Sequence, residues 1–215
     1  MTADDVAKVK GGVLTKNGKI TACGVVMLTN KIAVVSADCL DYNDSVVDWS
    51  TKYRIYISKG DNGLTGSYEV AKLDVHPKYD PVTKANNIAV VRIQLDAVET
   101  WTKLVAIGSD KWSTVVYAQL ILSNMTDITW DKPNIYVRDN VGGDDVCISM
   151  SPLYAANRNN YMCTQAITQP PVKTTPVCFV PYPILYAQVD GDLYQAGIFS
   201  HAVLMGGTNL CSYTS

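Results

Sequence analysis

Residues 22–28 read Ala-Cys-Gly-Val-Val-Met-Leu, and residues 34–39 read Val-Val-Ser-Ala-Asp-Cys. Both stretches are rich in valine and are bounded by polar or turn-forming residues, which predicts two strands, at residues 24–28 and 32–36. The second strand leads into a polar segment, residues 37–44, whose composition predicts a single helical turn or a loop. The pattern therefore indicates two strands followed by a short polar connection.

Similar stretches recur along the rest of the chain. Further strands are predicted at residues 53–58, 68–76, 88–93, 115–122, 135–138, 184–189 and 195–200. Turn residues separate them, and Asp190-Gly191 between two strand-like runs predicts a tight hairpin. Short strands at this spacing, without a long amphipathic helix, predict an all-β barrel or sandwich.

The chain also shows a natural division into two halves. The strand pattern loosens between residues 101 and 111, which predicts a crossover there. We therefore expect an N-terminal unit at residues 1–105 and a C-terminal unit at residues 106–215. A chain of 215 residues is long enough to give each unit a core of its own.

The composition is that of an ordered globular protein, with 47% hydrophobic and 18% charged residues. The formal net charge is −2, and the 18 lysines and arginines are spread without a basic cluster, which argues against a nucleic-acid partner. No apolar run approaches the roughly 18 to 20 residues that a membrane span requires. We therefore expect neither a nucleic-acid partner nor a membrane span, and the partner that we expect is a protein or a second copy of this chain.

Six cysteines are present, at positions 23, 39, 147, 163, 178 and 211. Their spacing does not indicate a zinc site, and the acidic turn containing Asp139, Asp144 and Asp145 lacks the ligand spacing of a calcium loop. We therefore expect no metal and no cofactor. Disulfide bonds are expected instead, and they imply secretion or another oxidising compartment. Two sequons, at Asn43 and Asn124, are compatible with secretion.

The stretch around Cys23 and Cys39 resembles the strands that lead to the catalytic histidine of chymotrypsin-like and trypsin-like serine proteases. That family reads Thr-Ala-Ala-His-Cys, and it bridges its two cysteines at the same separation of sixteen positions. Asp38 stands in the place of the histidine. The resemblance spans roughly residues 12–211 and implies two packed antiparallel β-barrels in the trypsin-like fold, one in each half.

Two further segments extend the resemblance. Residues 75–80 and 86–93 are similar to the family's His-Pro-x-Tyr loop and its Asn-Asp-Ile-Ala-Leu strand, and Asn87 stands in the place of the triad aspartate. Residues 178–184 stand where the family has Cys-x-Gly-Asp-Ser-Gly-Gly-Pro, which puts Tyr182 in the place of the serine nucleophile.

The resemblance also implies which cysteines pair, although the residues alone leave other pairings open. The implied bridges are Cys23–Cys39, Cys147–Cys163 and Cys178–Cys211. Such bridges stabilise a fold chiefly by restricting the unfolded chain, so we expect them to be structural rather than redox-active.

Acyl transfer in this family needs an imidazole base, an acid that orients it, a hydroxyl nucleophile and backbone donors for the oxyanion. Asp38 is a poor base near neutral pH, because an unperturbed aspartate has a pKa of about 3.9. Asn87 is a neutral amide and does not stabilise an imidazolium as a carboxylate does. Tyr182 is a phenol with an ordinary pKa of about 10. The resemblance therefore implies a catalytically inactive homologue.

The expected substrate pocket is altered as well. Val180 replaces a glycine whose amide helps to form the oxyanion hole, and Pro181 replaces the aspartate that pairs with the new N-terminus after zymogen cleavage. Pro176 stands at the base of the pocket, and Ser200 and His201 stand along its wall. These residues do not favour recognition of a basic side chain.

The chain has only two histidines, His76 and His201. We expect His76 to be a loop residue before Pro77, and His201 to line the degenerate cleft or contact a partner. A histidine-based mechanism would have to use one of them.

The leading expectation is a non-catalytic serine protease homologue that acts as a binding or self-assembling structural module. One alternative is a secreted decoy or inhibitor that competes for protease substrates or inhibitors. Another is a divergent hydrolase that uses His201 or the pair Asp38 and Asp41. Relative to the family, the fold is expected to be shortened at both ends, and this would leave unpaired strand edges that favour self-association.

Overall fold

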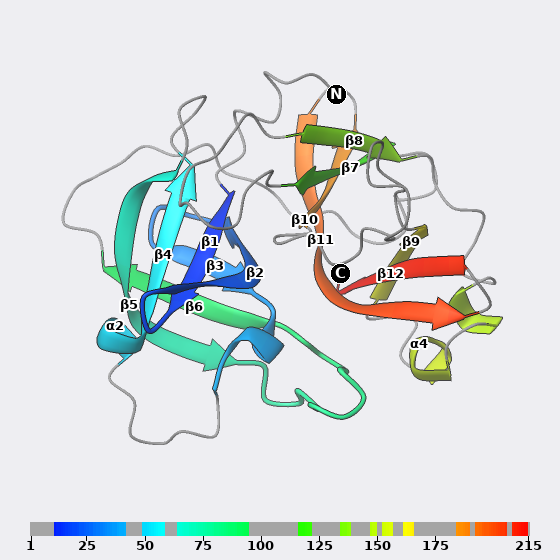
Figure 1. The fold of residues 1–215 in the computed structure, drawn as a ribbon, viewed down its shortest axis with the longest axis horizontal. Coiled ribbons are helices and arrows are strands. Elements are labelled where there is room, and N and C mark those ends of the chain that lie inside the picture. Colours follow the sequence, from blue (N-terminus) through cyan, green and yellow to red (C-terminus); the bar gives the residue numbers. More distant parts are fainter. Residues whose placement is uncertain are drawn as a thin grey trace.

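The computed structural model describes residues 11–41, 49–58, 64–94, 116–121, 134–138, 147–149, 152–156, 161–165, 184–189, 192–205 and 208–214. These residues form two groups of antiparallel strands, one from each half of the sequence (Figure 1). None of the described helices is long and apolar enough to cross a membrane. The all-β prediction is confirmed.

The first group is a closed barrel of six strands. In barrel order they are β1 (Gly11–Lys16), β2 (Lys19–Met27), β3 (Ile32–Val35), β6 (Ala89–Gln94), β5 (Leu64–Val75) and β4 (Tyr53–Ser58). Strand β1 pairs with β2 on one side and with β4 on the other, which closes the barrel.

Alternation of side chains builds the core of this barrel. In β6, Ala89, Val91 and Ile93 are buried, while the residues between them face outward or are half-buried. This period of two is what a strand with one face on a core requires. The largest fully buried side chains are Tyr53, Leu14, Met27, Ile55 and Ile57.

Two positions show why glycine is needed in and after β1. A Cβ atom at Gly12 would collide with the carbonyl oxygen of Tyr56 on the neighbouring strand β4. In the turn that follows, Asn17 and Gly18 have φ angles of 50° and 73°. Positive φ at both central residues is the requirement of a type I′ hairpin, which suits the twist between β1 and β2.

The second group is a six-stranded sheet in the order β8, β7, β10, β11, β12, β9. Their bounds are β7 (Val116–Ile121), β8 (Asn134–Arg138), β9 (Tyr161–Gln165), β10 (Ile184–Val189), β11 (Asp192–Met205) and β12 (Thr208–Thr214). If the six strands of each half are numbered one to six along the chain, the order in this sheet is 2-1-4-5-6-3. The closed barrel has the same order of neighbours when it is opened between β2 and β3. Pairing of β8 with β9, which would close a second barrel, stays a prediction.

Most strand predictions are confirmed, and β4 and β10 begin and end at the predicted residues. The short connection after β3 is a single 3-10 turn, η1 (Ala37–Cys39). The hairpin at Asp190-Gly191 is supported by the pairing of Val189 with Asp192. The proposed boundary at residue 105 lies outside the described residues.

Three strands were not predicted: β1, β9 and β12. β1 begins with Gly11 and Gly12, and glycine lowers strand propensity, so the sequence pattern did not predict this strand. Gly12 is required at this position because strand β4 approaches it closely. β9 pairs with β12, with Cys211 opposite Thr164, and β12 pairs on its other side with β11. β9 is therefore held by a strand far away in sequence, while β12 continues the hairpin that begins with β11.

Candidate functional site

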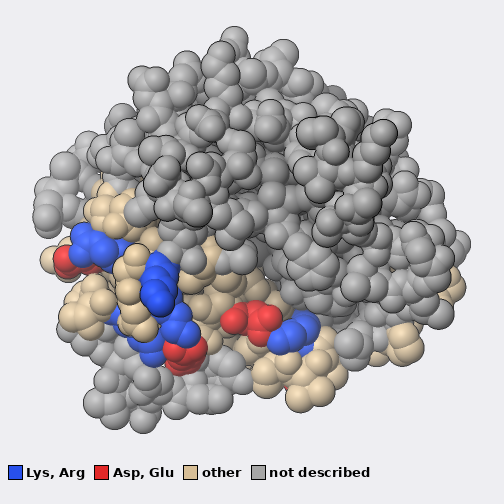
Figure 2. Space-filling view, in the orientation of Figure 1, with Lys and Arg blue, Asp and Glu red and all other residues tan. Residues whose placement is uncertain are grey.

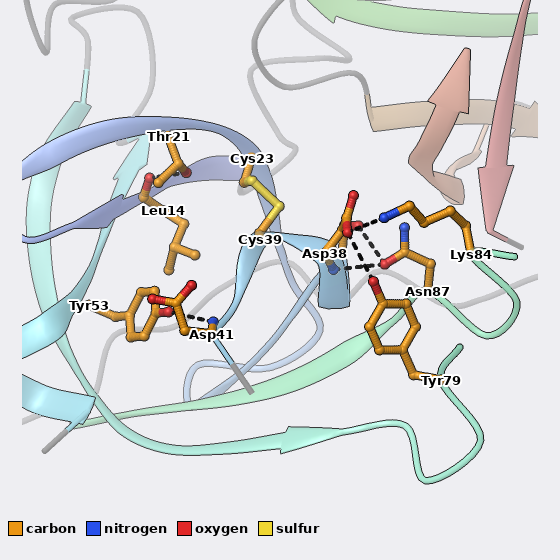
Figure 3. Close-up of a disulfide and its surroundings, with 11 residues drawn as sticks. Leu14, Thr21, Cys23, Asp38, Cys39, Asp41, Tyr53, Tyr79, Lys84 and Asn87 are labelled. Carbon is orange, nitrogen blue, oxygen red and sulfur yellow. Dashed lines mark hydrogen bonds and ion pairs between the residues drawn. A yellow bond between two sulfur atoms is a disulfide. The ribbon is translucent and has the colours of Figure 1, made fainter. Parts of the chain in front are cut away.

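The candidate site contains the residues that stand in the places of the catalytic histidine and aspartate. It lies where β3 ends and η1 begins, against the connection between β5 and β6 (Figure 3). Strands β3 and β6 pair with Val35 opposite Ala89. This register brings the residues just beyond the strand ends together, so Ser36 and Asp38 lie beside Asn87 although they are far from it in sequence.

Asn87 is the buried centre of the site, with an exposed fraction of 0%. Its side-chain oxygen accepts a hydrogen bond from the Ser36 hydroxyl, at 2.8 Å, and one from the Asp38 backbone N–H, at 2.9 Å. A buried polar group is stable only when it is hydrogen-bonded, and both donors meet this requirement. The amide thus fixes η1 to the segment that precedes β6.

Asp38 is exposed, and one of its two carboxylate oxygens is occupied. Its Oδ1 accepts hydrogen bonds from the Tyr79 hydroxyl, at 3.0 Å, and from the Lys84 ammonium, at 2.5 Å. The side chains of Lys84 and Asp38 are 28% and 43% exposed, so water partly screens this ion pair. The Asp38 carboxylate is therefore tied to two residues of the β5–β6 connection.

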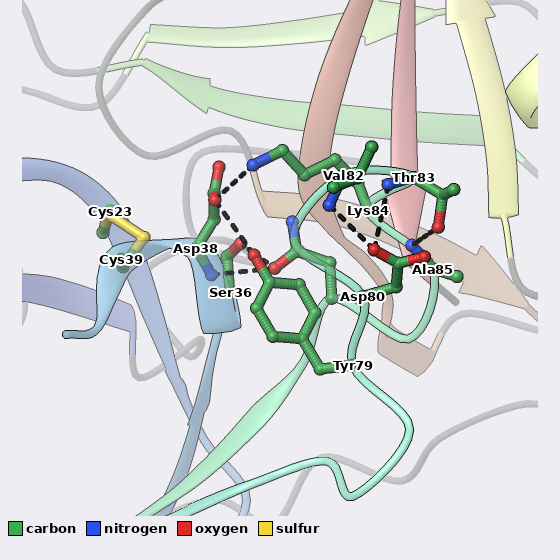
Figure 4. Close-up of polar contacts among 11 residues, drawn as sticks. Cys23, Ser36, Asp38, Cys39, Tyr79, Asp80, Val82, Thr83, Lys84 and Ala85 are labelled. Atoms are coloured by element: carbon green, nitrogen blue, oxygen red, sulfur yellow. Dashed lines mark hydrogen bonds and ion pairs between the residues drawn. A yellow bond between two sulfur atoms is a disulfide. The ribbon is translucent and has the colours of Figure 1, made fainter. Parts of the chain in front are cut away.

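That connection is held by its own side chains (Figure 4). The Asp80 carboxylate accepts hydrogen bonds from the backbone N–H groups of Val82, at 2.8 Å, and Thr83, at 3.3 Å. The Thr83 hydroxyl first, and then these two amides, lower the pKa of Asp80 below its ordinary value. Lys84 has a φ of 57°, a left-handed conformation within this turn.

His76 is a loop residue, as predicted. It follows the end of β5, and its backbone N–H donates to the Ile88 carbonyl at 3.0 Å. Its Nδ1 accepts a hydrogen bond from the Lys78 N–H at 3.2 Å. The imidazole therefore takes part in the shape of the loop.

Asp41 lies in a separate ionic network from Asp38. Its carboxylate pairs with Lys16, at 2.6 Å, and Lys52, at 3.0 Å, and its backbone N–H donates to the Tyr53 hydroxyl at 2.9 Å. Hydrogen bonds from Lys16 first, and then from Lys52, lower the pKa of Asp41, and partial burial opposes them. The two aspartates therefore have different lysine partners.

Figure 2 shows lysine or arginine side chains next to aspartate or glutamate side chains in the described part of one face of the molecule. Ion pairs also lie along the barrel strands, whichever face they occupy. Arg54 pairs with Glu69 at 3.1 Å, and Asp74 pairs with Lys72 at 2.6 Å. In the part of the chain that the structure describes, no three metal-ligating side chains gather into a cluster.

Two of the three predicted disulfides are confirmed. Cys23 is bonded to Cys39, with 6.1 Å between their Cα atoms, and Cys147 is bonded to Cys163, with 6.4 Å. The first bridge joins β2 to η1 next to Asp38 (Figure 3). Cys178 lies outside the described residues, so its bond to Cys211 stays a prediction.

Several predicted site residues cannot be placed from the described ranges. Tyr182, Pro176, Val180 and Pro181 lie outside them, as do the acidic turn with Asp139, Asp144 and Asp145 and the sequons at Asn43 and Asn124. Ser200 and His201 lie in β11, and the pairing of β11 with β12 shifts register between Phe199 and His201. Their backbone thus forms an irregular step in the sheet.

Sequence reasoning missed three members of the site: Ser36, Tyr79 and Lys84. Tyr79 belongs to the His-Pro-x-Tyr segment, which was recognised, but its contact with Asp38 was not foreseen. Lys84 carried no signal, because its partner Asp38 lies 46 positions away.

A model of the trypsin family matches residues 8–170, which is more than half of the chain. No curated protein matched the chain. The closed six-stranded barrel, the six-stranded sheet with the same strand order and the two disulfides agree with that match. The chain therefore belongs to the trypsin family and has its all-β fold.

Proposed function

We propose that this chain is a non-catalytic member of its family that acts as a binding or self-assembling structural module. The observation that carries the proposal is the arrangement around Asp38, at the position that the resemblance assigns to the catalytic histidine. A carboxylate that already accepts hydrogen bonds from Lys84 and Tyr79 is a poor base for a hydroxyl nucleophile. These contacts support a structural role for Asp38.

The surroundings of Asn87 support the same proposal. Its amide oxygen is used by Ser36 and by the backbone of Asp38, so it joins two segments of the barrel. In an active protease of this family, the corresponding aspartate holds the tautomer of the histidine and stabilises its charged form. At the position that the resemblance assigns to the histidine, Asn87 meets an aspartate instead of an imidazole, and we infer that its amide serves the fold.

The expected changes at Tyr182, Val180 and Pro181 complete the argument from sequence. A phenol between two prolines is a weak nucleophile, and prolines remove backbone donors from the segment that would bind an oxyanion. Replacement of the catalytic base, the acid and the nucleophile together favours a family member that acts by binding other molecules instead of by catalysis.

Two alternative functions, a decoy or inhibitor and a divergent hydrolase, differ from the proposed one in properties that can be measured. A decoy or inhibitor would occupy the substrates or inhibitors of active proteases and can act as a monomer, whereas a structural unit associates with itself through a large interface. A divergent hydrolase would need a proton donor and acceptor in reach of each other. The lowered pKa of Asp41, which keeps this group ionised near neutral pH, does not favour a role as general acid beside Asp38.

Solution mass and hydrolysis, measured on the same sample, test the proposal. Light scattering coupled to size-exclusion chromatography separates an assembling module, which gives an oligomer at micromolar concentration, from a monomeric binder. In parallel, fluorogenic peptide and ester substrates are incubated with the wild type and with Asp38→Ala. The expected result is the same background rate for both. Turnover that Asp38→Ala or His201→Ala abolishes would refute the proposal.

A further inference from the structure

A cavity of about 370 Å³ lies on the N-terminal barrel, between η1, α2 (Trp49–Lys52), the end of β5 and the loop after it. Among the described residues its walls are Leu40, Trp49, Leu73, Val75, His76, Pro77 and Tyr79. Its volume falls in the range of about 300 to 1,000 Å³ that is typical of small-molecule sites. No function discussed above uses this cavity.

The walls are anchored in the barrel core. Leu40 is 4% exposed and belongs to the core cluster, and Trp49, Leu73, Val75 and Tyr79 are partly buried against the same cluster. Side chains that pack on a core keep their positions, so an entering ligand need not order them. The cavity is therefore largely formed before any ligand arrives.

Two polar side chains of the described walls, those of His76 and Trp49, offer hydrogen-bond donors. The His76 Nδ1 accepts the Lys78 N–H, so a neutral imidazole carries its proton on Nε2. The indole of Trp49 also carries an N–H that only donates. The Tyr79 hydroxyl donates to Asp38, outside this set. A ligand that matches these groups offers an acceptor.

The described walls of the cavity do not favour a charged ligand. The described walls include no lysine, arginine, aspartate or glutamate. Asp38, which accepts a hydrogen bond from the wall residue Tyr79, is already paired with Lys84. A buried charge without a partner costs several kcal/mol, on the order of what a small ligand gains by binding.

We propose that this cavity binds a small uncharged molecule with an aromatic or branched apolar body and one carbonyl acceptor. The apolar body packs against Leu40, Leu73 and Val75, and the carbonyl accepts a hydrogen bond from His76 or Trp49. The site is independent of whether the chain is catalytic.

Three probes with the same body test the charge requirement: 3-phenylpropanamide, 3-phenylpropanoate and 3-phenylpropylammonium. Binding is followed by the methyl resonances of Leu40, Leu73 and Val75 during titration. We expect saturable shifts of these methyl groups, with the amide binding at least about fivefold more tightly than either ion. Absence of saturation, or tightest binding by either ion, would contradict the proposal.

Variants separate this cavity from general surface binding. Leu73→Phe fills the cavity and is expected to weaken the amide at least about tenfold, whereas Val82→Phe, at a position that is 82% exposed, leaves its affinity unchanged. If Leu73→Phe does not fold, the double variant His76→Phe/Trp49→Phe is used instead, because it removes the hydrogen-bond donors of both wall side chains. That double variant is expected to bind the amide no better than propylbenzene. Unchanged preference for the amide would overturn the proposal.

Discussion

The two halves of this molecule have the same strand order, but the described strands form a closed barrel in one half and an open sheet in the other. The N-terminal half is a closed barrel, with β2 paired to β3, while the described strands of the C-terminal half form a sheet whose outer members are β8 and β9. Each half also contains a disulfide that spans sixteen positions. The comparison teaches that strand order and a cysteine bridge are common to both halves, while the candidate site is built from residues just beyond the strand ends of the closed barrel.

The largest effect is expected when a buried side chain in the core of the closed barrel is truncated. Ile55 in β4 is 0% exposed, and Ile55→Ala should lower the free energy of unfolding by about 2 to 5 kcal/mol. Val82→Ala, at an exposed loop position, should change it by no more than about 0.5 kcal/mol. Urea unfolding followed by circular dichroism measures both. Equal effects of the two substitutions would mean that the barrel core does not dominate stability.

The two disulfides give the sharpest comparison of the halves. Because both close loops of sixteen positions, chain entropy predicts about 3 kcal/mol for each, lost in Cys23→Ala/Cys39→Ala and in Cys147→Ala/Cys163→Ala. Urea unfolding of the two double variants provides the measurement. A large difference between them would show that the halves do not unfold as one unit or that one bridge is strained.

Removing the acceptor at the buried site should have an intermediate effect. Asn87→Ala leaves the Ser36 hydroxyl and the Asp38 N–H without their acceptor, and should lower the free energy of unfolding by about 1 to 3 kcal/mol. Ser36→Ala is the matched control, because the amide oxygen still accepts from Asp38, and its cost should be smaller. Thermal unfolding of the two variants checks this order, and a larger cost for Ser36→Ala would contradict the assigned role of Asn87.

Lowered pKa values at Asp41 and Asp80 predict a loss of stability in acid. Because the folded pKa of each group lies below its unfolded value, the stabilisation is fully present above the ordinary aspartate pKa and is lost as pH falls through the lowered folded value. Asp41→Asn should therefore be less stable than the wild type near neutral pH, and the two should converge in acid. Unfolding curves measured between neutral pH and strong acid give the test, and a constant difference would refute it.

The smallest effect is expected for the ion pair at the place of the catalytic histidine. Lys84→Met removes the partner of Asp38 and should cost no more than about 1 kcal/mol, because both side chains are partly exposed. The cost should shrink in high salt, since ions screen exposed pairs. A cost of several kcal/mol, independent of salt, would mean that the pair is effectively buried.

Sequence was sufficient for the strands whose own residues alternate or run as valine-rich segments, as β3, β4 and β6 do. It failed at β1, where Gly12 serves the close approach of β4. The positions of Asp38 and Asn87 followed from the motifs around them. The contacts of Asp38 with Tyr79 and Lys84 did not, because they depend on how the β5–β6 connection folds back over η1.

The central claim, that this family member does not perform acyl transfer, is tested most directly by its reaction with a fluorophosphonate. The purified protein is incubated with the reagent, with an active serine protease as positive control, and its intact mass is measured. We predict no added mass on the wild type. An adduct on a single residue that Asp38→Ala prevents would contradict the account, because it would mean that a nucleophile near Asp38 is activated.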